Sequence, residues 1–382
     1  MHDDLVLTTG FSVQMRNLIT YMASQGVEWS TVSQQFRKGE VRKIGDFCTE
    51  YPSGWNDEEK YAENLPQVID IVKPDVGFGL FDVQDMARWK KNMGSLPMAY
   101  WLPKDNEENI PDEFKAINSV DQAIAMSQFS REFFLKHNVD IPRVYHSVDC
   151  TAFRPLPEPA LNELYANQTF DINKQVPPDY TLLLYVGRLG WRKNIELLFG
   201  ATRELINRGR KVILYMHTDM NDVGGDLNPR KLTHAFGLWN NTIVTGGQSM
   251  APEKLNLIYN RADIYVSTHA GEGFGVPMAE AMACGKPVVA TDYTTTKEFV
   301  GEYERGIAVP YERVLMDHGV YRPLVDINKF ATAVEYLIDN PSERARMGSN
   351  GVEFAKREFD IPVVGRAMLD ILSDFTTNEC SV

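Results

Sequence analysis

The chain has 382 residues, of which 43% are hydrophobic and 24% are charged, and its formal net charge is −13. This length is too great for one ordinary hydrophobic core and favours two domains, and the composition is that of a globular protein in water. The negative charge argues against non-specific binding of nucleic acid, which requires a basic surface. Two basic clusters, RKGEVRK at 37–43 and RWKK at 88–91, are interpreted as solvated faces rather than as membrane or phosphate patches.

The cysteines and the N-terminus bear on the cellular compartment. The four cysteines are widely spaced, without a CxxC pair or a His/Cys cluster, so neither a disulfide framework nor a metal site is expected. The first residues, MHDDLVLTTG, lack the basic and apolar regions of a secretory signal. No run approaches the roughly 18–20 apolar residues of a spanning helix. We therefore expect a cytoplasmic protein in which any membrane contact is peripheral.

In the first half of the chain, short apolar runs alternate with longer amphipathic stretches, a pattern typical of parallel strands covered by helices. The expected strands are residues 5–8, 76–80, 98–102, 123–125 and 143–146. The expected helices are residues 13–24, 59–72, 82–92, 112–118 and 128–137. Residues 154–180 then carry five prolines and no sustained period, which indicates a linker.

The second half restarts the same alternation. The expected strands are residues 180–186, 211–217, 241–245, 264–267, 288–291 and 307–309. The expected helices are residues 195–208, 230–237, 252–261, 327–340, 342–359 and 361–375.

The sequence therefore predicts two Rossmann-like α/β domains with parallel sheets, residues 1–155 and residues 180–358, joined by a linker at 156–179. A C-terminal helix within residues 359–382 is expected to pack back towards the N-terminal domain. In open sheets of this kind ligands bind beyond the carboxyl ends of the strands, so we expect the site in a cleft that the two domains face.

The most informative segment is residues 269–292, HAGEGFGVPMAEAMACGKPVVATD, which contains Glu272 and Glu280. Glycines beside an acid suit a loop whose backbone approaches a polar ligand, because no Cβ stands in the way. Glu280 falls in a helix that begins near Pro277, and the first N–H groups of a helix can bind an anion. Carboxylates that accept hydroxyl groups, beside amides that hold an anion, suit a phosphorylated sugar.

A second motif follows the strand at 182–186. The segment GRLGWRKN places Gly187 and Arg188 at the end of this strand and Lys193 where the next helix begins. Two cations at a strand-to-helix junction can hold a diphosphate and stabilise the charge of a departing nucleoside diphosphate. Taken alone, the motif is more simply interpreted as a pair of surface cations in a loop.

GRLGWRKN followed by EGFGVPMAEAMACGKPVVATD resembles the GT-B-fold, nucleotide-sugar-dependent glycosyltransferases of the retaining family 4 (group 1) type. The signatures of that family are a Gly-Arg-Leu…Lys junction and two glutamates separated by seven residues. SVDQAIAMSQFSREFFLKH, YHSVDCTAFRP and LNLIYNRADIYVSTHAGEGFG resemble further segments of it. The resemblance extends over about residues 65–375.

The resemblance implies a role for each matching residue. Arg188 and Lys193 are expected to contact the diphosphate of the donor, and Glu272 to lie against the donor sugar. Glu280 is expected to accept hydrogen bonds from the ribose hydroxyls; the alternative is a helix acid stabilised only by the helix dipole. The other expected donor-binding residues are Gly187, His269, Gly273, Phe274 and Gly275. For His269, a structural histidine is the alternative.

The N-terminal domain is expected to supply the acceptor site. Gly10 lies between the first strand and the first helix, where the backbone can approach a donor phosphate or an acceptor; a plain turn is the alternative. After the strand at 98–102, where many relatives carry a histidine, this chain has Lys104 and Asp105. Asp105 is a candidate for positioning the acceptor or the donor sugar, and a plain loop residue is the alternative.

These motifs predict transfer of a sugar from a nucleotide-diphosphate sugar to a hydroxyl of a glycan, a lipid-linked sugar or another acceptor. The catalytic candidates are Glu272, Asp105, Arg188 and Lys193. No DxD-like pair follows a strand, so no metal or other cofactor is expected, and the resemblance implies retention. Open alternatives are an inverting GT-B transferase, a nucleotide-sugar epimerase and a non-catalytic nucleotide-sugar-binding protein. A dinucleotide-dependent oxidoreductase is disfavoured because no GxGxxG follows the first strand.

Overall fold

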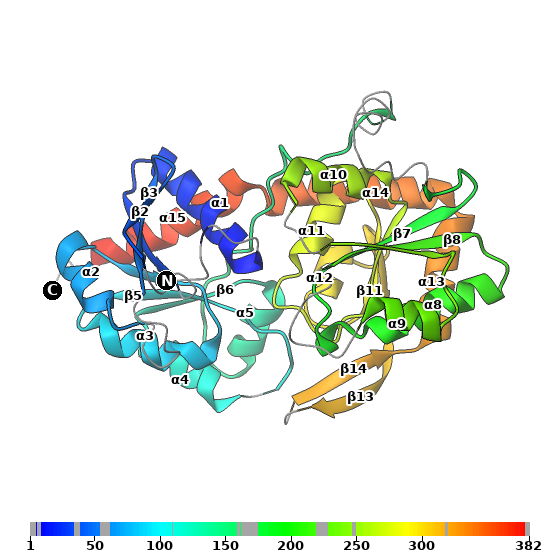
Figure 1. Ribbon diagram of the computed structural model, residues 1–382. Coiled ribbons are helices and arrows are strands. Elements are labelled where there is room, and N and C mark those ends of the chain that lie inside the picture. The colour runs from blue at the N-terminus through cyan, green and yellow to red at the C-terminus, as the bar shows by residue number, and fades with distance from the viewer. Residues whose placement is uncertain are drawn as a thin grey trace. The chain divides into compact units, whose positions relative to one another are not determined.

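The computed structural model describes residues 5, 9–33, 39–53, 62–108, 110–158, 161, 175–218, 228–246, 250–317 and 320–378 (Figure 1). The chain divides into two compact units. Unit 1 comprises Met1–Ser147 and Asp360–Val382, and unit 2 comprises Val148–Phe359. Both units are α/β with parallel strands, as the alternation of apolar runs and amphipathic stretches predicts.

Unit 1 contains two three-stranded sheets. In the first, β4 (Gly77–Gly79), β5 (Met98–Leu102) and β6 (Gln122–Ala125) are parallel. In the second, β1 (Trp29–Ser33) is parallel to β3 (Cys48–Pro52), and β2 (Arg42–Ile44) is antiparallel to β3. The helices of the unit are α1 (Gly10–Ser24), α2 (Leu65–Val72), α3 (Met86–Met93), α4 (Pro111–Ser119), α5 (Gln128–Lys136) and α15 (Ile361–Asn378), with a short η2 (Val83–Asp85).

The C-terminal helix α15 packs against α1, the first helix of the chain (Figure 1). The backbone of α15 approaches a side chain of α1 closely: a Cβ on Gly365 of α15 would lie 2.2 Å from Cδ1 of Tyr21 in α1. A glycine is therefore needed at this crossing, and the last helix is a structural part of unit 1.

Some expected elements of unit 1 differ from the structure. The strand expected at 5–8 lies, apart from Leu5, outside the described residues. The strand expected at 143–146 is reduced to a single bridge between Ala125 and Arg143. The strands β1, β2 and β3 were not expected, because their half-exposed polar residues interrupt the apolar pattern.

Unit 2 is built on a six-stranded parallel sheet in the order β12-β11-β10-β7-β8-β9. Its strands are β7 (Thr181–Val186), β8 (Val212–His217), β9 (Thr242–Thr245), β10 (Ile264–Ser267), β11 (Val288–Thr291) and β12 (Gly306–Val309). Its helices are α8 (Ile195–Asn207), α9 (Pro229–Ala235), α10 (Pro252–Arg261), α11 (Val276–Ala283), α12 (Thr296–Val300), α13 (Ile327–Asp339) and α14 (Pro341–Glu358).

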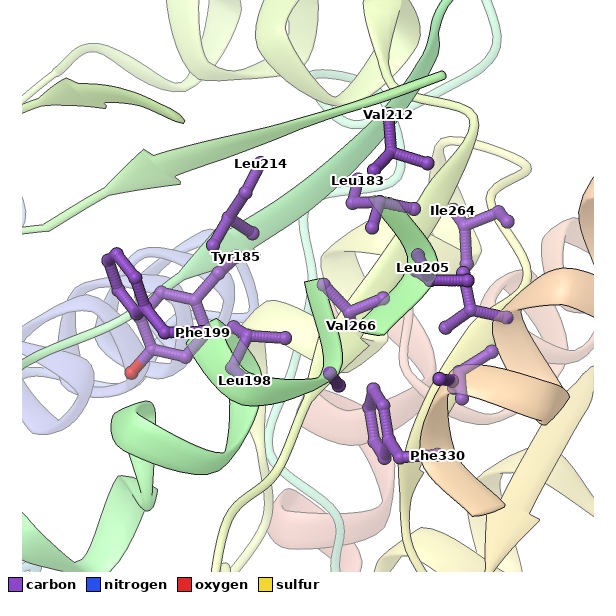
Figure 2. Packing of buried hydrophobic residues seen from close by; sticks show 14 of the residues in the cluster. Leu183, Tyr185, Leu198, Phe199, Leu205, Val212, Leu214, Ile264, Val266 and Phe330 are labelled. Carbon is purple, nitrogen blue, oxygen red and sulfur yellow. The ribbon is translucent and has the colours of Figure 1, made fainter. Parts of the chain in front are cut away.

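The core of unit 2 packs one face of this sheet against α8 and α13 (Figure 2). Leu183 and Tyr185 of β7 and Val266 of β10 meet Phe199 of α8 and Phe330 of α13. Five of the six residues of TLLLYV in β7 are buried, as expected for a strand covered on both faces. This packing fixes the carboxyl ends of β7 and β10, from which the site loops leave.

Two further features complete unit 2. An antiparallel hairpin, β13 (Tyr311–Asp317) and β14 (Val320–Val325), follows β12 and was not expected from the sequence. Unit 2 begins at Val148, and within it Asn256 and Asn260 of α10 accept hydrogen bonds from the backbone N–H groups of Arg154 and Leu156. None of the helices in the described part of the chain has the length and apolar character needed to cross a membrane.

Candidate active site

The strand order of unit 2 reverses between β7 and β10. From β7 the chain adds β8 and β9 on one side, and it then returns to add β10, β11 and β12 on the other. The loops that leave β7 and β10 therefore diverge at the carboxyl edge of the sheet. In open α/β sheets this is where ligands bind.

The loop after β7, residues 187–194, is called the cation loop. Gly187 and the exposed Arg188 begin it, and a short η3 (Trp191–Lys193) leads into α8. The hydroxyl of Tyr185 donates a hydrogen bond to the carbonyl of Arg188 at 2.7 Å, which ties the start of the loop to the core. The sequence motif therefore lies at the strand-to-helix junction, as predicted.

The loop after β10, residues 268–275, is called the glutamate loop, and it is bound to the cation loop. The N–H of Ala270 donates to the carbonyl of Arg192 at 2.7 Å, and Nη1 of Arg192 donates to the carbonyl of Gly271. The Glu272 carboxylate accepts from Nζ of Lys193 and lies 3.3 Å from Nη1 of Arg192. Two cations and one carboxylate thus meet where the strand order reverses.

These charges control the ionisation of Glu272. Its burial raises the pKa, but the neighbouring Lys193 and Arg192 outweigh burial and hold that pKa below its usual range. Glu272 is therefore ionised at neutral pH. The cluster carries one net positive charge before any ligand binds, which favours an anion.

His269 holds the glutamate loop in place. The ring is fully buried; its Nδ1 accepts the N–H of Gly271 at 3.1 Å, and its Nε2 lies 2.8 Å from Oγ1 of Thr296. The hydrogen-bond pattern assigns the proton to Nε2. Both ring nitrogens therefore take part in hydrogen bonds within the protein. Direct contact of His269 with a donor remains a prediction.

The rest of the glutamate loop is shaped by its backbone. The N–H of Glu272 donates to Oγ1 of Thr294 in the loop after β11, at 2.9 Å. Phe274 is buried, and its ring packs 5.0 Å from that of Phe299, so the residue can offer a ligand only its backbone. Gly275 has φ +92°, and a Cβ there would lie 2.4 Å from Cε of Met278. Glycine is therefore required at 275, whereas Gly273 does not have a positive φ.

Glu280 lies on α11, which begins after Gly275 with Pro277 in its first turn, as predicted. Its side chain is not a solvated helix acid: Glu280 is only 8% exposed and accepts a hydrogen bond from the Tyr259 hydroxyl of α10 at 2.7 Å. Burial raises the pKa of Glu280 to about 7, although the Tyr259 hydrogen bond opposes this shift. Contact of this carboxylate with a ribose remains a prediction.

This pKa makes stability depend on pH. Glu280 titrates near 4.5 when unperturbed and near 7 when folded, so between these values the folded chain holds a proton that the unfolded chain has lost. The free energy of unfolding should therefore fall as pH rises through this window, by about 3 kcal/mol in total. Burial raises the pKa of the facing Tyr259, Tyr265 and Cys284, which keep their protons throughout.

Urea unfolding at pH 5, 6, 7 and 8 tests this for the wild type and for Glu280→Gln. The glutamine variant lacks the titrating group. Its free energy of unfolding relative to that of the wild type should therefore increase as pH rises. A difference that stays constant with pH would contradict the prediction, since all other titrating groups are shared.

The two N-terminal candidates lie in unit 1, whereas the charge cluster lies in unit 2. Gly10 is the exposed first residue of α1, which Thr9 caps by accepting the N–H of Ser12 at 3.2 Å. Asp105 is half-buried after β5 and accepts a hydrogen bond from Nδ2 of Asn106 at 3.0 Å. Their predicted ligand contacts remain predictions.

Lys104, beside Asp105, is buried. Its Nζ lies 2.8 Å from the Glu113 carboxylate, and it donates to Oδ1 of Asn106 at 2.8 Å and to the carbonyl of Glu108 at 2.6 Å. Lys104 therefore stabilises the loop that carries Asp105.

Residues 167–354 match the sequence model of the family "Glycosyl transferases group 1". This segment, which makes up most of unit 2, identifies a glycosyl transferase domain of the group 1 type. The chain is similar to an alpha-D-kanosaminyltransferase of Streptomyces kanamyceticus, with 27% identity over 50% of this chain and 45% of the relative. It is also similar to D-inositol 3-phosphate glycosyltransferase 2 of Catenulispora acidiphila, with 28% identity over 68% of this chain and 58% of the relative. The chain spans about half the length of these curated relatives.

Solved structures share the fold of this chain. Sucrose-phosphate synthase from Thermosynechococcus elongatus superposes with a TM-score of 0.77 at 18% identity, over 96% of this chain and 94% of that one. HepE of Anabaena, solved with UDP, superposes with a TM-score of 0.71 at 15% identity, over 96% and 98%. These likenesses show the GT-B fold that the sequence predicts.

Three residues of the candidate site are not among those that the sequence predicts. Arg192 is adjacent to Lys193, and its charge was a usable signal. Thr294 and Tyr259 were not predictable, because nothing in their spacing from Glu272 and Glu280 indicates a contact. Within the described residues, no group of three or more His, Cys, Asp or Glu side chains is arranged to hold a metal ion.

Proposed function

We propose that the chain transfers a sugar from a nucleotide-diphosphate sugar to an acceptor hydroxyl, with retention of the anomeric configuration and without a required metal ion. The observation that carries the proposal is the meeting of Lys193, Arg192 and Glu272 where β7 and β10 diverge. The match of residues 167–354 to the group 1 family supports the reaction class. The UDP bound by HepE makes a uridine donor the first to test.

The cations act on the leaving group. As the bond between the anomeric carbon and the phosphate oxygen breaks, negative charge develops on the diphosphate. Lys193 and Arg192 can stabilise this charge in a partly buried site, where electrostatic interactions are stronger than in water. Arg188, at the exposed end of β7, is a third candidate for the same role.

Glu272 acts on the sugar. An ionised carboxylate beside the anomeric carbon stabilises the positive charge of an oxocarbenium-like transition state and orients the sugar hydroxyls. The acceptor oxygen then forms the new bond to the anomeric carbon on the face that the phosphate leaves. Its proton passes to the departing phosphate oxygen, which acts as the base. A polyol acceptor fits the name of the D-inositol 3-phosphate glycosyltransferase among the curated relatives.

The proposal is tested first by thermal unfolding with UDP-, GDP-, ADP- and dTDP-sugars. A ligand present at 100 times its Kd stabilises the folded chain by about 2.7 kcal/mol, so one of these donors should clearly raise the unfolding midpoint. With that donor and a sugar or polyol acceptor, NMR should show a product with the donor's anomeric configuration, and EDTA should leave the rate unchanged. Absence of stabilisation by every donor, an inverted product, or loss of activity in EDTA would contradict the corresponding part of the proposal.

A further inference from the structure

The hairpin β13–β14 of unit 2 (Figure 1) contacts the loops of the candidate donor site, although sequence motifs gave it no role. Its return strand β14 touches both loops. Nη1 of Arg322 donates a hydrogen bond to the carbonyl of Ala270 at 3.2 Å, and the guanidinium lies 5.4 Å from the centre of the Trp191 ring. Nδ2 of Asn194 donates to the carbonyl of Pro323 at 3.2 Å.

The base of the hairpin reaches the third loop. Tyr311, the first residue of β13, packs edge-on against Tyr293, with ring centres 5.6 Å apart. Tyr293 precedes Thr294, whose hydroxyl accepts the N–H of Glu272. The hairpin therefore contacts all three loops that leave β7, β10 and β11.

The burial of Arg322 indicates a specific role. It is 7% exposed, whereas the adjacent Tyr321 on the same strand is 50% exposed. Burying a guanidinium is costly unless its surroundings compensate, and the Ala270 carbonyl and the Trp191 ring both do so. Ala270 is two residues from Glu272, and Trp191 is two residues from Lys193.

We propose that Arg322 is a positioning residue of the donor site, which holds the cation loop and the glutamate loop at the spacing that binds a nucleoside diphosphate. This inference rests on the proposed function. Arg322 acts through the Ala270 carbonyl and the Trp191 ring rather than by touching the donor. It also makes the unexpected hairpin a functional part of the donor site.

The test compares Arg322→Met and Arg322→Lys with Tyr321→Ser, a control on the same strand. Calorimetry at a temperature where every variant is folded measures the affinity for whichever of UDP, GDP, ADP and dTDP binds the wild type most tightly. Arg322→Met should weaken binding about tenfold, from loss of the charge-assisted hydrogen bond and of the ring contact. Arg322→Lys should recover part of this loss because it retains the charge, and Tyr321→Ser should bind like the wild type.

A double-mutant cycle with Trp191→Leu separates positioning from direct donor contact. If Arg322 acts through Trp191, the loss of binding free energy in the double variant should be much smaller than the sum of the losses in the two single variants. Additive losses, or unchanged affinity in Arg322→Met with only a lower unfolding midpoint, would overturn the inference while leaving the donor site intact. Failure of the wild type to bind any of the four diphosphates would overturn the proposed function itself, and the inference with it.

Discussion

Glu272→Gln is expected to lower turnover at least about 100-fold while leaving the affinity for a nucleoside diphosphate unchanged or up to about tenfold tighter. The loss arises because the carboxylate that stabilises the sugar in the transition state is gone. The affinity is preserved because Lys193 and Arg192, which Glu272 partly neutralises in the unliganded site, then offer their full charge to the diphosphate. Steady-state rates and calorimetry with the same nucleotide measure the two effects separately.

A matched control is Glu253→Gln, at the exposed start of α10, which should leave both quantities unchanged. Near-normal turnover in Glu272→Gln would remove Glu272 from the active site. A parallel loss of turnover and of diphosphate affinity would instead assign it the role of a scaffold for the two cations.

Removing the cations is expected to lower turnover and nucleoside diphosphate affinity together. Lys193→Ala should weaken nucleoside diphosphate binding about 30-fold, and the Arg192→Ala and Lys193→Ala double variant at least about 100-fold, because each charge-assisted contact to phosphate contributes roughly 1.5–3 kcal/mol. Turnover should fall with the affinity, since the same cations stabilise the leaving group. Binding by the wild type should also weaken with added salt more steeply than binding by the double variant.

Calorimetry at two salt concentrations provides this comparison, with Lys254→Ala on the exposed face of α10 as the control. Arg188→Ala should be included, because the sequence pairs Arg188 with Lys193 whereas the structure pairs Arg192 with Lys193 at Glu272. If the double variant binds the diphosphate as tightly as the wild type does, the cation loop is not the phosphate site.

The parallel sheet of unit 2 was predictable strand by strand because buried parallel strands are continuous apolar runs, such as VILYMH in β8. The hairpin β13–β14 and the strands β1–β3 were not, since charged and polar residues interrupt the apolar runs, as in YERVLMD of β13 and RKI of β2. Their pairing is set by tertiary contacts rather than by local periodicity.

Residues of the candidate site were predictable from the sequence, but the contacts between them were not. The motifs identified Lys193 and Glu272, but their ion pair joins loops far apart in the chain, and no local pattern encodes such a contact. The burial of Glu280 likewise depends on Tyr259 from another helix. Lys104 was visible beside Asp105, whereas its buried partner Glu113 belongs to the following helix and appears in the sequence as one more helix acid.

The pairing of α1 with α15 has a consequence for biosynthesis. Unit 2 is one continuous segment, Val148–Phe359, and its two ends are joined by a hydrogen bond of 2.7 Å from the Val148 N–H to the Phe359 carbonyl. Unit 1 is completed only by the last helix of the chain. On the ribosome, unit 1 therefore cannot be completed until α15 has been made, whereas the whole sequence of unit 2 emerges before α15 does.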